Sequence, residues 1–230
     1  MRNPAESRIH ARTRTSYDIL AADYADYYRS ELAAKPLDRA LLGGFAELVR
    51  TADVGPVADL GCGSGRVTAY LHSLGLPVFG VDLSPRMVAT ARHAYPGIKF
   101  HEGSLTALDL EACSLGGILA WYSIIHIPDA ELPQVFAEFE RMLAPGGYLQ
   151  LAFQVGDGQL HQTEAGGHEI SLDFYQRQPE QTIELVKDTG MELVAQVLRE
   201  PDGEGQFAEN TPQGFVLARK PEQEIRTGID

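Results

Sequence analysis

The sequence has few cysteines and no long apolar run. Its two cysteines, Cys62 and Cys113, exclude a disulfide framework and any CxxC metal motif. Residues 1–20 contain no apolar stretch of signal-peptide length, and no segment approaches the roughly 18 apolar residues of a membrane helix. We therefore expect a soluble, cytoplasmic protein without a membrane partner.

Positive charge is also scarce. The 230 residues carry 19 lysines and arginines against 32 aspartates and glutamates, which gives a formal net charge of −13. Such a field repels the phosphate backbone of nucleic acids, so we do not expect DNA or RNA as a partner. The arginines that gather near the N-terminus are interpreted as a solvated tail; they are Arg2, Arg8, Arg12 and Arg14.

The segment from Pro56 onward alternates short apolar runs with amphipathic stretches, which is typical of a parallel sheet wrapped by helices. The predicted strands are Val57–Leu60, Val78–Val81, Ile98–His101, Gly117–Trp121 and Tyr148–Phe153, followed by the hairpin Met191–Arg199 and Gln213–Ala218. The predicted helices are Tyr17–Leu32, Leu37–Arg50, Arg66–Ser73, Pro85–Ala94, Ala130–Met142 and Pro179–Asp188. Ser84 is expected to cap the helix at Pro85, and Asp129 the helix at Ala130.

The most informative segment is Val57-Ala-Asp-Leu-Gly-Cys-Gly-Ser-Gly-Arg66, in which an apolar strand runs into three alternate glycines and then a helix. Gly61, Gly63 and Gly65 permit a tight turn and let the backbone contact a ligand without an intervening Cβ. The helix that follows directs its free N–H groups toward that ligand. The pattern therefore predicts a ligand site at this turn.

An acidic residue ends the next predicted strand. Asp82 lies 17 residues after Gly65, where a carboxylate accepts hydrogen bonds from both hydroxyls of a ribose. Dinucleotide-binding proteins use GxGxxG, whose third glycine would fall at position 66, occupied here by Arg66. The GxGxG spacing, with Asp59 just before it, leaves no compact pyrophosphate cradle and suits a ligand with an amino acid end and a nucleoside end.

These motifs resemble those of the class I S-adenosylmethionine-dependent methyltransferases of the small-molecule type, over about residues 15–220. Asp59–Gly65 is similar to their first motif, Asp82 to their ribose-binding acid, and residues 120–129 to the motif of their fourth strand. The resemblance implies a doubly wound α/β fold with a seven-stranded, mostly parallel, Rossmann-like sheet and a final antiparallel hairpin. It also implies S-adenosylmethionine as cofactor, lying across the C-terminal ends of strands one, two and four.

The same resemblance implies the cofactor site and the organisation of the chain. The expected cofactor-binding residues are Tyr17, Asp59, Gly61, Gly63, Gly65, Asp82, Leu83, Met87, Ser104 and Leu105. Residues 1–230 then form a single methyltransferase domain. It consists of an N-terminal helical cover (15–55), a cofactor-binding core (56–155), a substrate-side insertion (156–175), and a last helix and hairpin (176–220).

Methyl transfer from a sulfonium requires alignment of donor and acceptor, and a general base only if the acceptor arrives protonated. The candidate catalytic residues are Tyr122, after the fourth strand, and His168, in an insertion that we expect to form a mobile cover with the N-terminal helix. Tyr122 fits a core position equally well, and His126 is interpreted as a buried structural histidine. His161, Glu164 and His168 match no tight metal spacing, so no metal site is predicted.

The sequence thus favours methyl transfer from S-adenosylmethionine to a small-molecule acceptor by in-line displacement, in a monomer or homodimer. Two alternatives stay open: a cofactor-binding regulatory protein without turnover, and a nicotinamide-dependent oxidoreductase, which the missing third glycine disfavours. Residues 120–123, Ala-Trp-Tyr-Ser, lack the Asn-Pro-Pro-Tyr or Asp-Pro-Pro-Tyr signature of enzymes that methylate exocyclic nitrogens of nucleic-acid bases and protein glutamines. The methylated atom, whether O, N, C or S, stays open.

Overall fold

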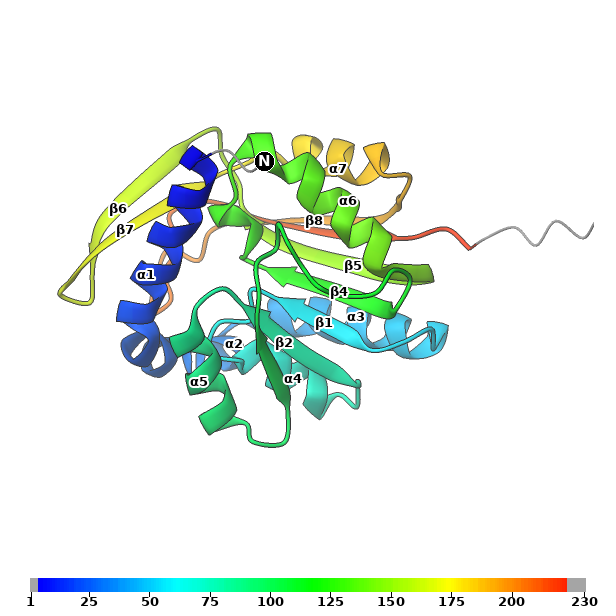
Figure 1. The fold of residues 1–230 in the computed structure, drawn as a ribbon, viewed down its shortest axis with the longest axis horizontal. Helices are drawn as coiled ribbons and strands as arrows, with labels where there is room; N and C mark the ends of the chain where they lie inside the picture. The colour runs from blue at the N-terminus through cyan, green and yellow to red at the C-terminus, as the bar shows by residue number, and fades with distance from the viewer. Residues whose placement is uncertain (1–3, 223–230) are drawn as a thin grey trace, which may run out of the picture.

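The computed structural model describes residues 4–222 and contains a seven-stranded sheet in the order β3-β2-β1-β4-β5-β9-β8 (Figure 1). The strands of this sheet are β1 (Val57–Leu60), β2 (Val78–Asp82), β3 (Lys99–Glu102), β4 (Leu115–Trp121), β5 (Leu143–Gln154), β8 (Glu192–Arg199) and β9 (Gln213–Arg219). Strands β1 to β5 are parallel, and β9 runs antiparallel to both β5 and β8. The predicted fold class, including the final antiparallel hairpin, is confirmed.

Helices cover both faces of this sheet. One face carries α3 (Pro36–Ala52) and α4 (Arg66–Ser73), and the other carries α6 (Leu132–Met142) and α7 (Pro179–Asp188). Every residue of the central strand β4 is buried, and alternate residues enter different cores. Ile118 packs with α6 and α7, whereas Leu119 packs with α3 and α4. This is why β4 reads as a continuous apolar run in the sequence.

The two predicted helix caps have different outcomes. Helix α5 (Pro85–Ala94) begins as predicted, because the Ser84 hydroxyl accepts a hydrogen bond from the Met87 N–H at 3.0 Å. The prediction for Asp129 is wrong. A 3₁₀ turn, η2 (Asp129–Glu131), precedes α6, and the Asp129 carboxylate instead accepts from Arg177 Nε at 2.9 Å. An ion pair across 48 residues has thus displaced a local cap.

The N-terminal segment is not a solvated tail. Helix α1 spans Pro4–Tyr28 and a short α2 spans Glu31–Ala34, so α1 begins well before the predicted Tyr17. Arg12 donates to the buried carboxylate of Asp173 at 3.1 Å, while Arg2 lies outside the described residues. The N-terminal half of α1 has few large apolar side chains, so its sequence lacks an amphipathic stripe and the helix depends on tertiary contacts.

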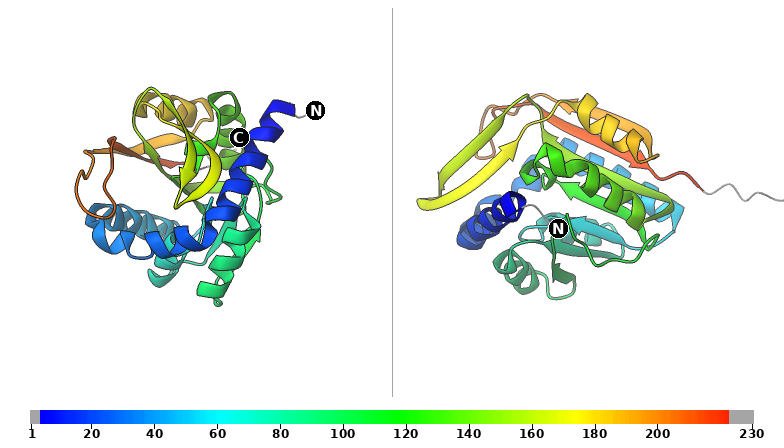
Figure 2. Two further views of the ribbon diagram at one scale, coloured as in Figure 1. Left: turned by 90° about the vertical axis from the view of Figure 1, so that its left-hand side faces the viewer. Right: turned by 45° about the horizontal axis from the view of Figure 1, so that its top comes forward.

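Those contacts come from a separate antiparallel hairpin of β6 (Gln159–Ala165) and β7 (His168–Tyr175). Leu20 of α1 packs against Ile170 and Leu172 of β7. Figures 1 and 2 show α1 and the hairpin together across the C-terminal ends of the parallel strands, away from the helical layers. Within residues 4–222, no helix is both long and apolar enough to cross a membrane.

Candidate active site

A pocket lies at the C-terminal ends of β1, β2 and β4, under α1. Its lining residues are His10, Thr13, Tyr17, Tyr24, Gly61, Gly63, Asp82, Leu83, Met87, Ser104, Leu105, Trp121, Tyr122, Ser123, His126 and Ile127. The space between them is ≈ 700 Å³ when the open solvent at the mouth is included. The pocket brings together all the predicted cofactor residues except Asp59 and Gly65.

The three glycines of the β1–α4 turn serve different purposes, although all have positive φ. A Cβ on Gly61 would lie 2.3 Å from the Ser123 Cβ, and one on Gly65 would lie 2.8 Å from the Phe100 ring. These two positions are closed by the protein itself. A Cβ on Gly63 would meet nothing closer than Tyr24 Cε1 at 3.8 Å. Gly63 therefore keeps space free on the pocket side, where a ligand would approach the backbone.

Asp82 holds this loop and faces the pocket. Its Oδ2 accepts from the Gly63 N–H and its Oδ1 from the Ser84 N–H, each at 2.8 Å. Burial raises the pKa of the Asp82 carboxyl to about 6. Because each carboxylate oxygen has a second lone pair, Asp82 can still accept hydrogen bonds from a ligand in the pocket.

Asp59 has a different role from Asp82, although both were predicted to bind cofactor. Its side chain is buried below the loop, and its Oδ2 accepts from the Thr68 hydroxyl at 2.6 Å. Burial raises the pKa of the Asp59 carboxyl to about 7. The contact joins β1 to α4, so the structure places Asp59 behind the glycine turn rather than on the pocket wall.

Hydrogen bonds hold helix α1 over the glycine-loop end of the pocket. Asp18 Oδ1 accepts from the Ser84 hydroxyl at 2.6 Å and from the Arg86 N–H at 3.2 Å. Ser84 is at the same time the N-cap of α5. The Asp18 carboxylate thus joins α1 to the turn that follows Asp82, and this contact holds α1 over the pocket as its roof.

A tyrosine–histidine pair lies under that roof. His126, on the 3₁₀ turn η1 (Ile124–His126), has its Nε2 2.6 Å from the Tyr17 hydroxyl and its Nδ1 2.8 Å from the Asp173 carbonyl oxygen. A carbonyl only accepts, so Nδ1 carries the proton and Nε2 accepts from Tyr17. Burial lowers the pKa of His126 to about 4, and burial also raises the pKa of Tyr17 well above its usual range. Both groups are neutral near pH 7.

The sequence indicates only that His126 is a buried structural histidine. The structure agrees that it is buried, at 7% exposure, and also places it in the pocket wall. The apolar run Ile124-Ile125-His126-Ile127 gave no signal of the pocket. Its partners Tyr17 and Asp173 lie 109 and 47 residues away, so the constellation is visible only in three dimensions.

The two predicted catalytic residues lie in different surroundings. Tyr122 lines the pocket, has a φ of 56°, and has a buried hydroxyl without a hydrogen-bond partner. His168 does not line the pocket. It is exposed on β7, where its Nε2 lies 2.9 Å from Asp23 Oδ2 of α1. The geometry gives His168 a contact between the hairpin and α1, outside the pocket lining, so a catalytic role for it stays a prediction.

His161, too, does not form a common site with Glu164 and His168. Its Nδ1 lies 2.8 Å from Asp173 Oδ1, which also accepts from Gln159 at 3.0 Å. Across residues 4–222 no group of three or more histidine, cysteine or acidic side chains is arranged to hold a metal ion.

Comparison with known proteins bears on this geometry. Residues 57–147 match the family model described as a methyltransferase domain. This span runs from β1 through the glycine turn, Asp82 and η1 to the start of β5, and it contains every strand end that meets the pocket. Over this span the chain is similar to methyltransferase domains.

Individual methyltransferases show how far the likeness extends. The chain is 37% identical over 92 residues to a demethylmenaquinone methyltransferase of Chlorobaculum parvum, which covers 40% of this chain and 37% of that protein. It is 35% identical over 119 residues to a trans-aconitate 2-methyltransferase of Escherichia coli, covering 51% and 45%. The chain thus spans less than half the length of these curated relatives.

A solved methyltransferase shares the fold over most of the chain. The magnesium protoporphyrin IX methyltransferase of Synechocystis, solved with bound S-adenosylmethionine, superposes with a TM-score of 0.66 at 16% identity. That superposition covers 92% of this chain and 97% of the other. In the chain described here, α1, the hairpin β6–β7 and the loop 200–212 all lie outside the segment matched by the family model.

Proposed function

We propose that this chain transfers a methyl group from S-adenosylmethionine to a small-molecule acceptor. The observation that carries the proposal is that one pocket joins the Gly63–Asp82 contact at one end to the Tyr17–His126 contact at the other. The first contact suits a nucleoside and the second a small polar group. The space kept free at Gly63 supports a ligand that meets the loop backbone.

The residues that would hold the cofactor follow from this arrangement. Asp82 would accept from the ribose hydroxyls, and Leu83, Met87 and Leu105 would pack against the adenine. Ser104 already shares a hydrogen bond with Thr106 at 3.0 Å, which leaves its hydroxyl a further lone pair for the base edge. When bound, S-adenosylmethionine supplies a methyl group attached to a sulfonium sulfur, and this attachment activates the methyl carbon for transfer.

The acceptor would meet Tyr17. Because the Tyr17 proton is directed at His126 Nε2, the lone pairs of the Tyr17 oxygen are free to accept from an acceptor O–H or N–H. A histidine with a pKa of about 4 is a weak base, so His126 orients Tyr17 more than it removes protons. We therefore propose Tyr17 and His126 as the acceptor-positioning pair, with Tyr122 in the neighbouring wall. For Tyr17 this proposal replaces the cofactor-binding role expected from the sequence.

Alignment is the main contribution that this pocket would make. Holding donor and acceptor in line can lower the barrier by ~7–11 kcal/mol. Helix α1, tied down by Asp18, excludes water from above. The names of the curated relatives, which concern trans-aconitate and demethylmenaquinone, support a small-molecule acceptor here as well.

The test has two stages. Calorimetric titration with S-adenosylmethionine, S-adenosylhomocysteine and NAD⁺ should show binding of the first two only. Trp121 is the single tryptophan of the chain and lines the pocket, so its fluorescence gives an independent readout. Incorporation of labelled methyl groups from S-adenosylmethionine into a metabolite extract should follow.

Each alternative function has its own outcome. Binding of NAD⁺ instead of S-adenosylhomocysteine would support the oxidoreductase. Cofactor binding with no methyl incorporation into any fraction of the extract would support a regulatory protein without turnover.

A further inference from the structure

The pocket wall offers no permanent cation. None of its lining residues is a lysine or an arginine. Of its two histidines, His126 has a pKa that burial lowers to about 4, and the His10 ring already lies 3.0 Å from Glu131 Oε2. A carboxylate or phosphate that leaves water needs a charged partner to offset its desolvation. An anionic acceptor would find none here.

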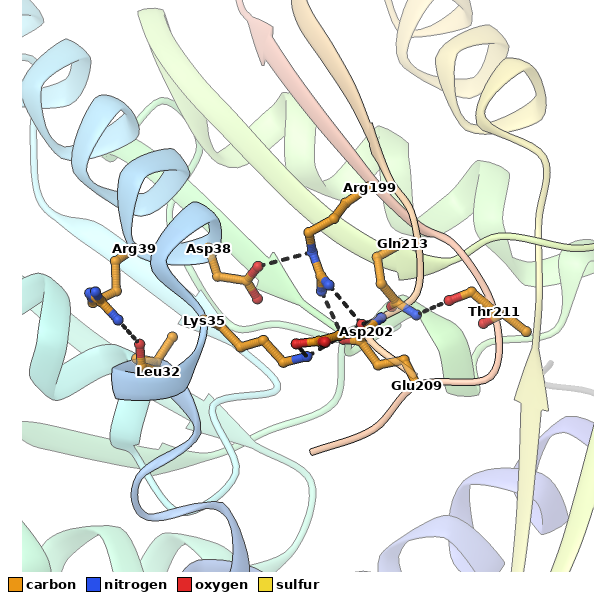
Figure 3. Close-up of polar contacts among 9 residues, drawn as sticks. All are labelled: Leu32, Lys35, Asp38, Arg39, Arg199, Asp202, Glu209, Thr211 and Gln213. Atoms are coloured by element: carbon orange, nitrogen blue, oxygen red, sulfur yellow. Dashed lines mark hydrogen bonds and ion pairs between the residues drawn. The ribbon is translucent and has the colours of Figure 1, made fainter. Parts of the chain in front are cut away.

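Cations do lie directly behind the wall, in a charged network at the start of α3 and the end of β8 (Figure 3). Its members, called here the Lys35–Arg199 network, are Lys35, Asp38, Arg199, Asp202 and Glu209. Arg199 holds Glu209 through two hydrogen bonds of 2.7 Å, and its Nε lies 3.4 Å from Asp38 Oδ1. Lys35 Nζ lies 3.1 Å from Asp202 and 3.4 Å from Glu209.

Tyr122 connects this network to the pocket. Its ring belongs to the pocket lining, and its buried hydroxyl has no hydrogen-bond partner. Burial and then the charge of Asp38 raise the pKa of Tyr122, while Arg199 acts in the opposite direction. The two sites are also joined by packing, since Tyr122 packs against the cluster that contains Phe215, and the Arg199 guanidinium lies 5.8 Å from the centre of the Phe215 ring.

The network pairs each cation with carboxylates and carries excess negative charge. Lys35 and Asp38 are each only 4% exposed, so their charges act through a medium that screens poorly. Both cations already contact two carboxylates, and three carboxylates face two cations. Arg66, which lies over the Tyr28 ring, pairs with the single carboxylate of Glu31. An anion in the pocket would meet a net negative field.

We propose that the acceptor is a neutral, mainly aromatic or apolar molecule with a hydroxyl or amine group, and that the Lys35–Arg199 network excludes carboxylate and phosphate acceptors. The proposal rests on the proposed function and names its substrate class. The lining supports the apolar part, since Trp121, Tyr122, Leu105 and Ile127 contribute rings and branched side chains. The Tyr17 oxygen supplies a directed polar contact.

The first experiment uses matched probes that differ by one carboxylate. Catechol is compared with protocatechuate, and 4-hydroxybenzyl alcohol with 4-hydroxybenzoate, by Trp121 fluorescence at saturating S-adenosylhomocysteine. Titrations at pH 8 keep Asp38 ionised, because burial raises its pKa to about 6. We expect each neutral probe to bind at least tenfold more tightly than its carboxylate partner.

The second experiment releases the cations. Glu209→Gln removes the carboxylate that both Arg199 and Lys35 contact, so the affinity for protocatechuate should rise on the order of tenfold while that for catechol is unchanged. Glu138→Gln is the matched control, because it frees Arg141 in an (i, i+3) pair on the surface of α6. Asp202→Asn, at a 56% exposed carboxylate, relieves Lys35 with little risk to folding.

The outcomes separate this inference from the proposed function. If S-adenosylhomocysteine does not bind, the proposed function fails. If it binds and the carboxylate probes bind as tightly as the neutral ones, or no neutral probe binds at millimolar concentration, the acceptor class is wrong. If neither Glu209→Gln nor Asp202→Asn changes the affinity for protocatechuate, the network is not what excludes anions.

Discussion

The glycine-loop end of the pocket and the α1 end are formed by different kinds of groups. At the first, the groups that face the ligand space come from residues 61–105 and include backbone N–H groups held by Asp82. At the second, the side chains of Tyr17 in α1 and His126 in η1 meet the backbone carbonyl of Asp173 in the hairpin, across 47 to 109 residues of sequence. A short turn can specify a cofactor surface by itself, whereas the acceptor surface requires the tertiary fold.

This difference predicts that substitutions at the two ends separate cofactor affinity from acceptor turnover. The expected effects below run from the largest to the smallest.

Asp59→Asn tests whether this acid serves the fold rather than the ligand. The folded pKa is raised from 3.8 to about 7, so the stability due to the protonated form is complete below about pH 4 and is lost as pH rises through 7. Wild type should lose about 4 kcal/mol of unfolding free energy between pH 4 and pH 8 relative to Asp59→Asn. Urea unfolding of both proteins measures this. Parallel pH profiles would contradict the assignment.

Gly61→Ala and Gly63→Ala form a matched pair on one turn. Gly61→Ala forces a Cβ against Ser123 and should destabilise the fold by on the order of 3 kcal/mol. Gly63→Ala should cost about 1 kcal/mol for its left-handed φ yet lower cofactor affinity at least tenfold, because its Cβ enters the ligand space. Thermal unfolding and calorimetry distinguish the two. Normal affinity in folded Gly63→Ala would show that the ligand does not approach the loop.

Asp82→Ala should weaken cofactor binding by one to two decades in Kd without unfolding the protein, since a charge-assisted hydrogen bond contributes ~1.5–3 kcal/mol. The pKa of Asp82 is about 6 in the free protein, and ribose hydroxyls favour the ionised form. Wild-type affinity should therefore reach a plateau above pH 6 and fall below it. A flat profile in wild type, or unchanged affinity in the variant, would contradict the ribose assignment.

Tyr17→Phe probes the acceptor end alone. Loss of one directed hydroxyl should lower kcat by roughly tenfold, the cost of a neutral hydrogen bond, and leave the Kd for S-adenosylhomocysteine within about twofold. His126→Gln, which can still accept from Tyr17, should retain more activity than His126→Ala. Equal loss of cofactor affinity and turnover would show that the two ends are not separable.

His168→Ala should have the smallest effect. Its exposed contact with Asp23 lies outside the pocket, so kcat should stay within about twofold of wild type, as expected for a surface ion pair. The mobile-cover prediction is tested in parallel, because amide hydrogen exchange in β6, β7 and α1 should slow when ligand is bound. A large fall in kcat would instead support a catalytic role for His168.

Sequence alone was sufficient where function depends on local chemistry. The Ser84 cap depends on Met87, three residues away, and forms as predicted. Gly63 and Asp82 meet because Gly63 follows β1 and Asp82 ends the neighbouring parallel strand β2. Sequence reasoning failed where the position of a side chain depends on a partner far away in the sequence. Asp129 pairs with Arg177 instead of capping a helix, Arg12 pairs with Asp173, and His126 contacts Tyr17. The periodicity of the sequence predicts none of these partners.

The hydrogen bonds from Ser84 and Arg86 to Asp18 have a kinetic consequence. They clasp α1 to the first turn of α5, directly above the residues proposed to hold adenine. On the proposed function, a nucleotide would enter only while that clasp is open, and the acceptor would enter beside the hairpin after it has closed. The expected scheme is a compulsory-order sequential one, with S-adenosylmethionine binding first and S-adenosylhomocysteine leaving last. S-adenosylhomocysteine would then inhibit competitively against S-adenosylmethionine and noncompetitively against the acceptor.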